Sequence, residues 1–379
     1  MEYKEYELGE LLYYEQPTPY IVESTDYNDA YETPVLTAGK SFILGYTDEK
    51  EGIFNQLPVI IFDDFTTASQ YVNFKFKVKS SAMKILTPVT ELVLPKYIYY
   101  RIQIIQFDHS THKRYWIQQY SKIRVSIPPI PEQECIVARI EELFSQLDAG
   151  VETLKKTKAQ LAVYRQAVLK EAFEGDYPRK QLKEFSKAIS GFAFKSSRYS
   201  PDGNYVVVKI GNVKERHFDF SRDLTKTLEA DDSILEKYLL RRGDCLITLT
   251  GSRGKRDYGF VVMVGNQNNY LLNQRVAALR FDQSVALPEF FQYYLASPSY
   301  RDMFFGYETG NVGQGNVGIK ALLDPYVILP DIDTQKRIVE DVEDRLSVCD
   351  SIEQTVDTAL QQAEAMRQSI LKDAFEGRL

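Results

Sequence analysis

The chain contains one long segment twice. Residues 125–175 align without a gap onto residues 327–377, at a constant offset of 202. Each copy carries a stripe of mostly apolar residues that recur every seven positions. The ten stripe positions are Ile140, Leu147, Leu154, Leu161, Val168, Val342, Cys349, Val356, Ala363 and Ile370. A stripe of this period over about five heptads predicts a coiled coil.

The sequence predicts where both helices begin and end. Pro131 predicts the start of the first helix and Asp333 the start of the second. Gly175 and Gly377 are placed for left-handed C-terminal caps. About 40 residues at ~1.5 Å each make a rod of roughly 60 Å. Since neither rod can bury its stripe alone, we expect the two to pack on each other antiparallel. Parallel packing and pairing with helices of another protein stay open.

The repeats divide the chain into four expected parts and predict an α+β fold class. Two globular segments of mixed helix and strand are separated by two long helices that form an antiparallel coiled coil. We expect a first head, a first long helix, a second head and a second long helix, at residues 1–127, 128–175, 176–329 and 330–379 respectively. β-Branched runs predict strands at residues 59–62, 205–210, 245–249, 260–264 and 276–281.

Composition and charge limit the kind of protein. Mean hydropathy is −0.32, and no apolar run approaches the ~18 residues that cross a bilayer. The sequence shows no apolar signal segment at its start, and its three cysteines are scattered, so we expect a cytoplasmic protein. The net charge of −7 argues at first against a nucleic-acid partner. Residues 176–326 nevertheless carry a net +4, which is compatible with DNA binding by the second head.

Two segments of the second head have the chemistry of a DNA contact. Residues 251–259 gather three cations, three glycines and a tyrosine between two predicted strands, and residues 273–275 stand at the entrance to a strand. Glycine allows close backbone approach, cations neutralise phosphates, and arginine can bond guanine edges. The candidate DNA-binding residues here are Ser252, Arg253, Lys255, Arg256, Tyr258, Asn273, Gln274 and Arg275. A solvated hairpin and an ordinary turn are the alternative interpretations.

Residues 308–318 contain the pattern G-x-G-x-x-G. A dinucleotide site is not expected, because no strand closely precedes the pattern and Pro325 stops any following helix. We expect instead a polar loop that follows a nucleic-acid backbone or stabilises the junction with the second long helix. Its candidate DNA-binding residues are Asn311, Gln314 and Asn316.

In the first head, residues 73–79 alternate apolar and basic side chains, as a half-exposed strand does. Residues 109–116 mix histidines, cations and aromatic residues, which could position and pack on DNA. The candidate DNA-binding residues of this head are Lys75, Lys77, Lys79, Ser81, Lys84, His112, Lys113 and Arg114. A solvated strand face is the alternative. A zinc site at His109 and His112 is not expected, because no further cysteine or histidine lies near them.

Motifs of catalysis are missing from the sequence. It contains no phosphate-binding loop, no nucleophile elbow, no nuclease carboxylate–lysine cluster and no Asn-Pro-Pro-aromatic tetrapeptide. We therefore expect no catalytic residues, no metal ligands and no cofactor bound by this chain.

Residues 243–259, 269–276 and 308–322 resemble the target-recognition domain of specificity subunits of Type I restriction–modification enzymes. Residues 130–133 and 172–175 resemble the entry and exit of the long helices of that family. The resemblance covers the whole chain in the order head, helix, head, helix.

The resemblance implies a subunit without catalytic activity that binds double-stranded DNA. Each head would recognise one half of a bipartite, gapped target, and helix length would set the gap. The helices would dock two methyltransferase subunits, and motor–nuclease subunits would join them for cleavage. S-adenosylmethionine, ATP and Mg would then be held by those partner subunits.

Two other functions remain open on the sequence. A coiled-coil scaffold would bind proteins through its heads without DNA recognition. A nuclease would use the basic loops with a divalent metal, although the carboxylate–lysine cluster it needs is missing from the sequence.

Overall fold

The structure is a computed structural model that describes residues 3–39, 41–109, 114–228, 230–311 and 313–379. The chain divides into two compact units, residues 1–155 with 357–379 and residues 156–356. Each unit thus holds one head, the first half of one long helix and the second half of the other. The expected four-part division stays a prediction. Within the described ranges, no helix is long and apolar enough to cross a membrane.

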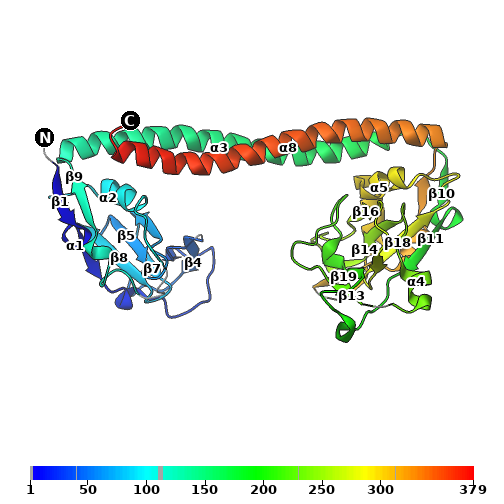
Figure 1. Cartoon of the computed structure of the whole chain (residues 1–379), viewed down its shortest axis with the longest axis horizontal. Helices are drawn as coiled ribbons and strands as arrows, with labels where there is room; N and C mark the ends of the chain where they lie inside the picture. The colour runs from blue at the N-terminus through cyan, green and yellow to red at the C-terminus, as the bar shows by residue number, and fades with distance from the viewer. Residues whose placement is uncertain (1–2, 40, 110–113, 229, 312) are drawn as a thin grey trace. The chain divides into compact units, whose positions relative to one another are not determined.

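The first head is built on a four-stranded antiparallel sheet in the order β2-β8-β5-β6, with a three-stranded sheet β4-β3-β7 and a strand pair β1-β9 (Figure 1). Its elements are β1 (Lys4–Glu7), α1 (Leu8–Leu11), β2 (Leu12–Glu15), β3 (Thr33–Leu36), β4 (Ile43–Thr47), β5 (Val59–Asp63), β6 (Ser69–Val72), β7 (Lys77–Val78), β8 (Met83–Pro88), α2 (Pro95–Ile102) and β9 (Arg124–Ile127). The strand predicted at residues 59–62 is confirmed. The strand predicted over residues 73–79 is wrong in extent, because only Lys77–Val78 pairs as a strand.

The second head repeats this plan with the orders β11-β18-β14-β16, β13-β12-β17 and β10-β20, and adds the pair β15-β19. Its elements are β10 (Arg179–Gln181), β11 (Ser186–Ser190), β12 (Tyr205–Val208), β13 (Lys226–Thr227), α4 (Asp232–Tyr238), β14 (Cys245–Thr248), β15 (Thr250–Ser252), β16 (Val261–Met263), β17 (Tyr270–Leu272), β18 (Val276–Phe281), α5 (Pro288–Ala296), α6 (Pro298–Gly306), β19 (Gln314–Asn316), α7 (Ile319–Leu323) and β20 (Tyr326–Ile328). The four strands predicted here are confirmed. In both heads the first and second strands of the three-stranded sheet are antiparallel, and the second and third are parallel. Two segments unlike in sequence therefore share one fold.

The two repeats form the long helices α3 (Ile130–Ala172) and α8 (Ile332–Phe375). At the start of α8, the Asp331 carboxylate accepts the backbone N–H of Thr334 at 3.0 Å, which caps the helix. Gly377 follows α8 with a φ of 71°, the left-handed cap expected there. The same expectation is wrong for Gly175. Its φ is not left-handed, and a Cβ at Gly175 would stand 2.4 Å from the ring of Tyr177, so close packing explains this glycine.

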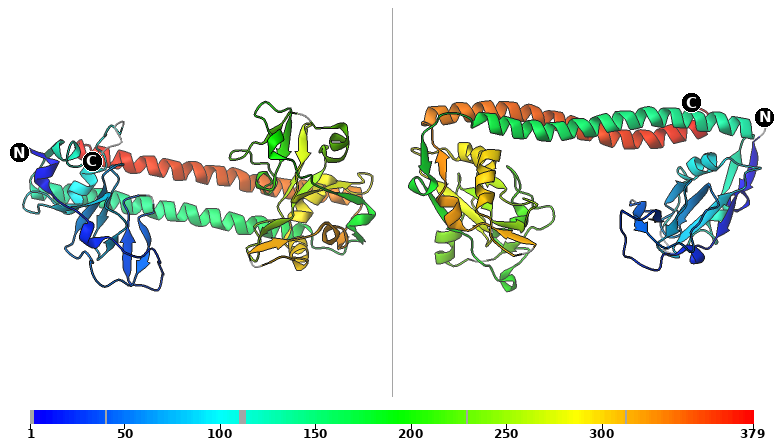
Figure 2. Two further views of the ribbon diagram at one scale, coloured as in Figure 1. Left: turned by 90° about the horizontal axis from the view of Figure 1, so that it is seen from below. Right: turned by 180° about the vertical axis from the view of Figure 1, so that it is seen from behind.

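Within each unit the parts of α3 and α8 run antiparallel, as predicted (Figure 2). In the second unit, Arg165 bonds Asp350 at 2.5 Å and Arg345 bonds Glu171 at 2.8 Å, so residue numbers rise along one helix as they fall along the other. In the first unit, Arg367 pairs with Asp148. Arg165 and Arg367 occupy the same position of the repeat, because they are separated by the offset of 202. Asp148 and Asp350 are related in the same way.

None of the ten stripe positions is exposed. Six of them are buried, namely Ile140, Val168, Val342, Cys349, Val356 and Ala363. The other four are half-buried, namely Leu147, Leu154, Leu161 and Ile370. The stripe thus supplies the apolar seam between the helices in each unit.

A buried glutamine fixes the start of each long helix to its head. Gln133 accepts the backbone N–H of Leu94 at 2.8 Å and donates to the carbonyls of Leu92 and Pro128. Leu94 immediately precedes α2, so one side chain ties the head, the linker and α3 together.

The second unit has the same joint at the repeat-related position. Gln335 accepts the N–H of Leu287, immediately before α5, at 2.8 Å and donates to the carbonyls of Val285 and Pro330. Both glutamine side chains are 0% exposed, so their bonds are made away from water.

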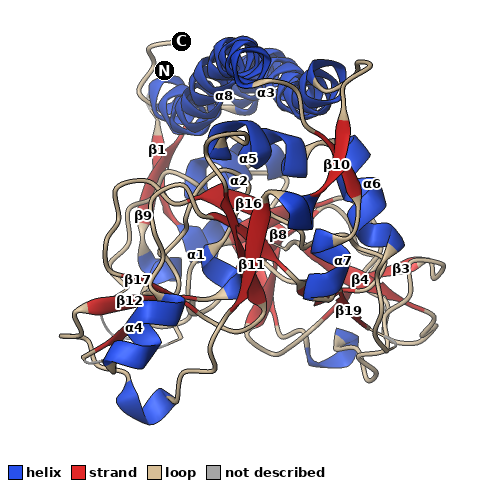
Figure 3. Cartoon of the chain, turned by 90° about the vertical axis from the view of Figure 1, so that its right-hand side faces the viewer, coloured by secondary structure: helices blue, strands red, loops and turns tan. Residues whose placement is uncertain are grey.

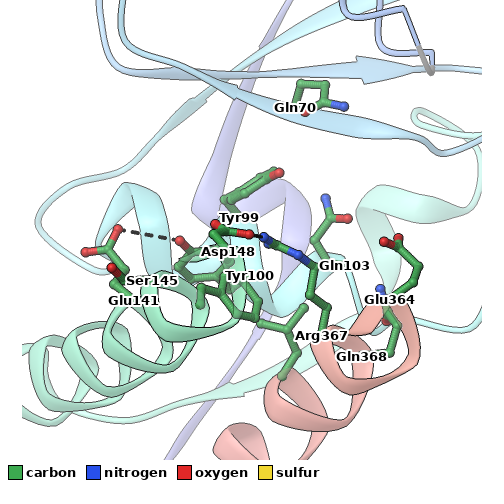
Figure 4. A pocket seen from close by; sticks show the side chains of 12 residues that line it. Gln70, Tyr99, Tyr100, Gln103, Glu141, Ser145, Asp148, Glu364, Arg367 and Gln368 are labelled. Carbon is green, nitrogen blue, oxygen red and sulfur yellow. Dashed lines mark hydrogen bonds and ion pairs between the residues drawn. The ribbon is translucent and has the colours of Figure 1, made fainter. Parts of the chain in front are cut away.

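The end of the opposite long helix completes each joint. Phe375 of α8 packs on Tyr97 of α2 with ring centroids 5.2 Å apart, and Phe173 packs on Phe290 of α5 at 5.3 Å. Figure 3 shows α5 lying between the helix pair and β16 of the second head. Figure 4 shows a pocket of the first unit between α2 and the two long helices, where the Arg367 guanidinium reaches Asp148.

Replacement of Gln335 by methionine tests the joint. The substitution keeps side-chain length but leaves three buried backbone groups without partners, so we expect a loss of about 2–4 kcal/mol in unfolding free energy of the second unit. Urea unfolding with hydrogen exchange at α5 measures this loss. Gln362→Met, at an exposed position of α8, is the control and should change stability by less than about 0.5 kcal/mol. Equal stability of the two variants would contradict the assigned role.

Candidate nucleic-acid interface

Two loops predicted separately to contact DNA form one surface in the second head. β15 and β19 pair antiparallel, with Gly251 opposite Gly315 and Ser252 opposite Gln314. The backbone N–H of Val317 donates to the carbonyl of Leu249 at 2.9 Å and anchors the second loop beside the end of β14. The structure therefore joins the segments 251–259 and 308–318.

A cleft of about 360 Å³ lies beside this strand pair. It is lined by three predicted residues, Ser252, Arg275 and Gln314, each from a different candidate segment. The sequence interpretation missed Lys214 and Thr250, which also line it. The charged run at residues 214–217 was the available signal for Lys214.

The backbone of Arg275 is fixed while its side chain is exposed. Its carbonyl accepts the N–H of Leu249 at 3.0 Å, and its φ of 70° lies in the left-handed region that non-glycine residues rarely adopt. Arg275 immediately precedes β18 in the core of the sheet. A guanidinium presented from such a rigid support is suited to directional hydrogen bonding with a ligand.

The loop 251–259 is held by its own polar groups. Asp257 accepts the backbone N–H of Ser252 at 2.7 Å, and hydrogen bonds from Ser252 lower the pKa of this carboxyl. Arg253 donates to the carbonyl of Gly310 at 2.8 Å, which ties this loop to the glycine-rich one. Arg256 pairs with Asp302 of α6 at 2.7 Å. Lys255 is exposed at the loop tip.

The expectation that Tyr258 contacts DNA is corrected by its burial. Tyr258 is 1% exposed, packs against Phe305 and donates its hydroxyl to Glu308 at 2.7 Å. A Cβ at Gly315 would lie 2.7 Å from this hydroxyl, so that glycine is required by close packing against the tyrosine. Tyr258 therefore braces the two loops from inside.

The expectation for Asn273 needs a similar correction. It is 9% exposed, and its side-chain oxygen accepts the backbone N–H of Gln274 at 2.8 Å, so it shapes the turn before β18. Gln274, Asn311 and Asn316 are exposed around the cleft and the paired strands. Their contact with DNA stays a prediction.

In the first head, the expected basic strand face does not form. Lys77 is 4% exposed and pairs with Glu49 at 2.8 Å, and Lys84 is 0% exposed and lies 3.5 Å from Asp64. These two lysines are structural in this head. Lys75, Lys79 and Ser81 are exposed.

The segment 109–116 is only partly described. His112 and Lys113 lie outside the described residues. Arg114 is exposed, whereas Tyr115 and Trp116 are buried, with Trp116 packing on Phe62 at 5.3 Å. The aromatic residues therefore pack in the core of the head. Among the described residues of this segment, Arg114 is the cation exposed to a ligand.

A second cavity of about 670 Å³ lies where the second head meets α3 and α8. Glu215, Arg216 and His217 line it from the head, and Arg165, Asp350 and Glu353 line it from the helices. Arg216 bonds Asp350 at 3.3 Å across it. Burial raises the pKa of the Glu215 carboxyl to about 7 against the opposing charges of Arg301 and Arg216.

Comparison with known proteins agrees with the resemblance found in the sequence. The family model described as "Type I restriction modification DNA specificity domain" matches residues 174–362. The chain is 45% identical over 196 residues to the Type I restriction enzyme EcoR124I/EcoR124II specificity subunit of Escherichia coli, covering 48% of each chain. It is 29% identical over 279 residues to the EcoKI specificity subunit of E. coli strain K12, covering 69% of this chain and 58% of that one. The matches thus span about half to three fifths of these relatives.

Solved structures share the fold. A chain from a study of complex assembly and conformational transition of the type I R-M system superposes with a TM-score of 0.71 at 17% identity, covering 100% of this chain and 98% of that chain. The HsdS subunit from Thermoanaerobacter tengcongensis superposes with a TM-score of 0.51 at 18% identity, covering 100% and 97%.

The buried carboxyl of Glu215 predicts a pH dependence of stability. Its pKa rises on folding from the usual 4.5 to about 7, so the folded protein retains a proton that the unfolded chain releases. The unfolding free energy should therefore fall as pH rises from about 4.5 to 7, by up to about 3 kcal/mol, and level off above. Glu215→Gln should flatten this decline in pH-resolved urea unfolding. A variant with the same slope as the unaltered chain would contradict the prediction.

Proposed function

We propose that this chain, which belongs to the family of specificity subunits of Type I restriction–modification systems, selects the DNA sequence on which such a system acts. The two heads share one fold but differ in sequence and in the side chains they expose. Each head would recognise its own half of a bipartite, gapped target. The expectation that helix length sets the gap remains part of this proposal.

The cleft of the second head is the observation that carries DNA recognition. It gathers an arginine, a lysine, a glutamine and a serine, at Arg275, Lys214, Gln314 and Ser252. Arginine pairs with guanine and glutamine with adenine through two hydrogen bonds each, while lysine neutralises phosphate. The rigid backbone around this cleft favours sequence recognition over loose electrostatic attraction alone.

The proposal includes partner subunits and no catalysis by this chain. Two methyltransferase subunits would dock on the long helices, and motor–nuclease subunits would join for cleavage. S-adenosylmethionine, ATP and Mg would be bound by those partners. The described residues hold no group of three or more His, Cys, Asp or Glu side chains suited to a metal.

Arg275→Ala tests the second head. The variant would be expressed with the cognate methyltransferase subunit in a host without other modification systems, and methylated positions would be mapped across the genome. We expect relaxed recognition in one half of the target, with about tenfold or greater loss of discrimination, since one bidentate arginine–base pair contributes ~1–3 kcal/mol.

Arg198→Ala is the matched control, because Arg198 is exposed on the same head, pairs with Asp231 and does not line the cleft. It should leave the methylation map unchanged. An unchanged map for Arg275→Ala would remove the cleft from the recognition site. A map that does not depend on the chain at all would refute the proposed function.

A further inference from the structure

The shared fold of the two heads identifies the edge of the first head that corresponds to the cleft of the second. At the end of β5, Asp63 pairs with Met83 of β8, and at the end of β14, Thr248 pairs with Val276 of β18. These strand pairs occupy the same place in sheets of the same order. The cleft of the second head opens at this end of β14, so its counterpart lies at the end of β5.

One backbone hydrogen bond made at the same place in each head supports the correspondence. In the first head, Tyr115 donates to the carbonyl of Asp64 at 2.9 Å, as Val317 donates to Leu249 at 2.9 Å in the second. Tyr115 and Val317 are thus anchored at the same point of the two folds.

The turn that follows the third strand of the three-stranded sheet supports the same correspondence between the heads. After β7, Lys79 donates its N–H to the carbonyl of Leu36 at 3.1 Å, and after β17, Asn273 donates to Val208 at 3.2 Å. The turn that carries Ser81 therefore corresponds to the turn that carries Gln274 and Arg275.

Three exposed polar side chains gather at this edge of the first head. Ser81 lies on the turn before β8, Arg114 immediately precedes the anchored Tyr115, and Gln16 follows β2. The Gln16 side-chain oxygen accepts the ammonium of Lys84 at 3.2 Å, and the Ser81 carbonyl lies 3.4 Å from the same ammonium. One buried lysine thus connects two of the three segments.

A buried ion pair beneath these side chains connects the third. Asp64, 1% exposed, accepts the N–H of Trp116 at 2.7 Å and lies 3.5 Å from the Lys84 ammonium. The pair Lys84–Asp64 therefore joins the segment that presents Arg114 to those that present Gln16 and Ser81. In the second head, Ala277 takes the place of Lys84 and Leu249 the place of Asp64. Both are apolar, so this buried ion pair has no counterpart at the corresponding positions of the second head.

We infer that the first head recognises its half of the target with Gln16, Ser81 and Arg114 at this edge, and that Lys75 takes no part. The inference rests on the proposed function and assigns Gln16, which the sequence patterns did not mark. Arginine and glutamine supply hydrogen bonds to base edges, and the hydroxyl of serine bonds either a base or a phosphate. Lys75 precedes β7, whereas the turn that carries Ser81 follows it.

The test is a methylation map of a host that expresses the whole chain with its cognate methyltransferase subunit. The double variant Gln16→Ala/Arg114→Ala changes two exposed side chains but removes the Gln16 acceptor of the buried Lys84 ammonium, which keeps its pairing with Asp64. A modest drop in the thermal unfolding temperature is therefore expected, and circular dichroism should show that the variant is folded at the temperature of the assay. We expect loss of base discrimination of about tenfold or more in one half of the target. The affected half should be the one that Arg275→Ala leaves intact. Lys75→Ala is the control cation and should leave the map unchanged.

An unchanged map for the double variant would overturn the inference, as would a change confined to the half that Arg275→Ala affects. A change in the first half caused by Lys75→Ala would also overturn it, because recognition would then extend to the opposite end of β7. If the unaltered chain imposes no methylation pattern, the proposed function fails and this assignment fails with it. A pattern that responds to Arg275→Ala but not to the double variant refutes only the assignment.

Discussion

One buried glutamine in each unit determines how a head is attached to a long helix. Gln133 and Gln335 each satisfy one backbone N–H and two backbone carbonyls with the same pattern of partners. Because buried backbone groups without partners cost about 1–3 kcal/mol each, the head cannot pivot on the helix without breaking this set. The joint therefore holds each head in a fixed orientation to its own helix segment.

Charged residues beside the apolar stripe define how the helices pair. Arg165 bonds Asp350 and Glu353, and the repeat-related Arg367 bonds Asp148. Exposed ion pairs add little stability, but a slip of one heptad would separate these partners in both units at once. The repeat thus supplies an apolar seam for affinity and charged positions for register. Within this chain the helices are the repeated part, and the two heads differ in sequence.

The sequence predicted the parts of the structure that depend on local pattern. The heptad stripe, the start of α8 and the five β-branched strands were all legible, because their periodicity and capping residues act over a few positions. The same reasoning failed for Lys77 and Lys84, because a strand-like alternation does not reveal the distant carboxylates of Glu49 and Asp64. It failed for Tyr258 since its partner Glu308 lies on another loop.

The joining of separate segments was also beyond local pattern. Loops 251–259 and 308–318 were marked independently, and only the fold shows that they pair as β15 and β19. The glutamine joints have the same origin, because a single buried amide has no periodicity of its own. Resemblance to the family motivated the proposed function, while the coordinates showed which residues share a surface.

The two heads are proposed to recognise DNA independently of each other. The most direct measurement replaces residues 1–124 with the corresponding segment of another member of the family and maps methylation in the host. Independent recognition by the two heads predicts that one half of the modified sequence changes completely while the other half stays as it was. Loss of both halves, or retention of both, would contradict it.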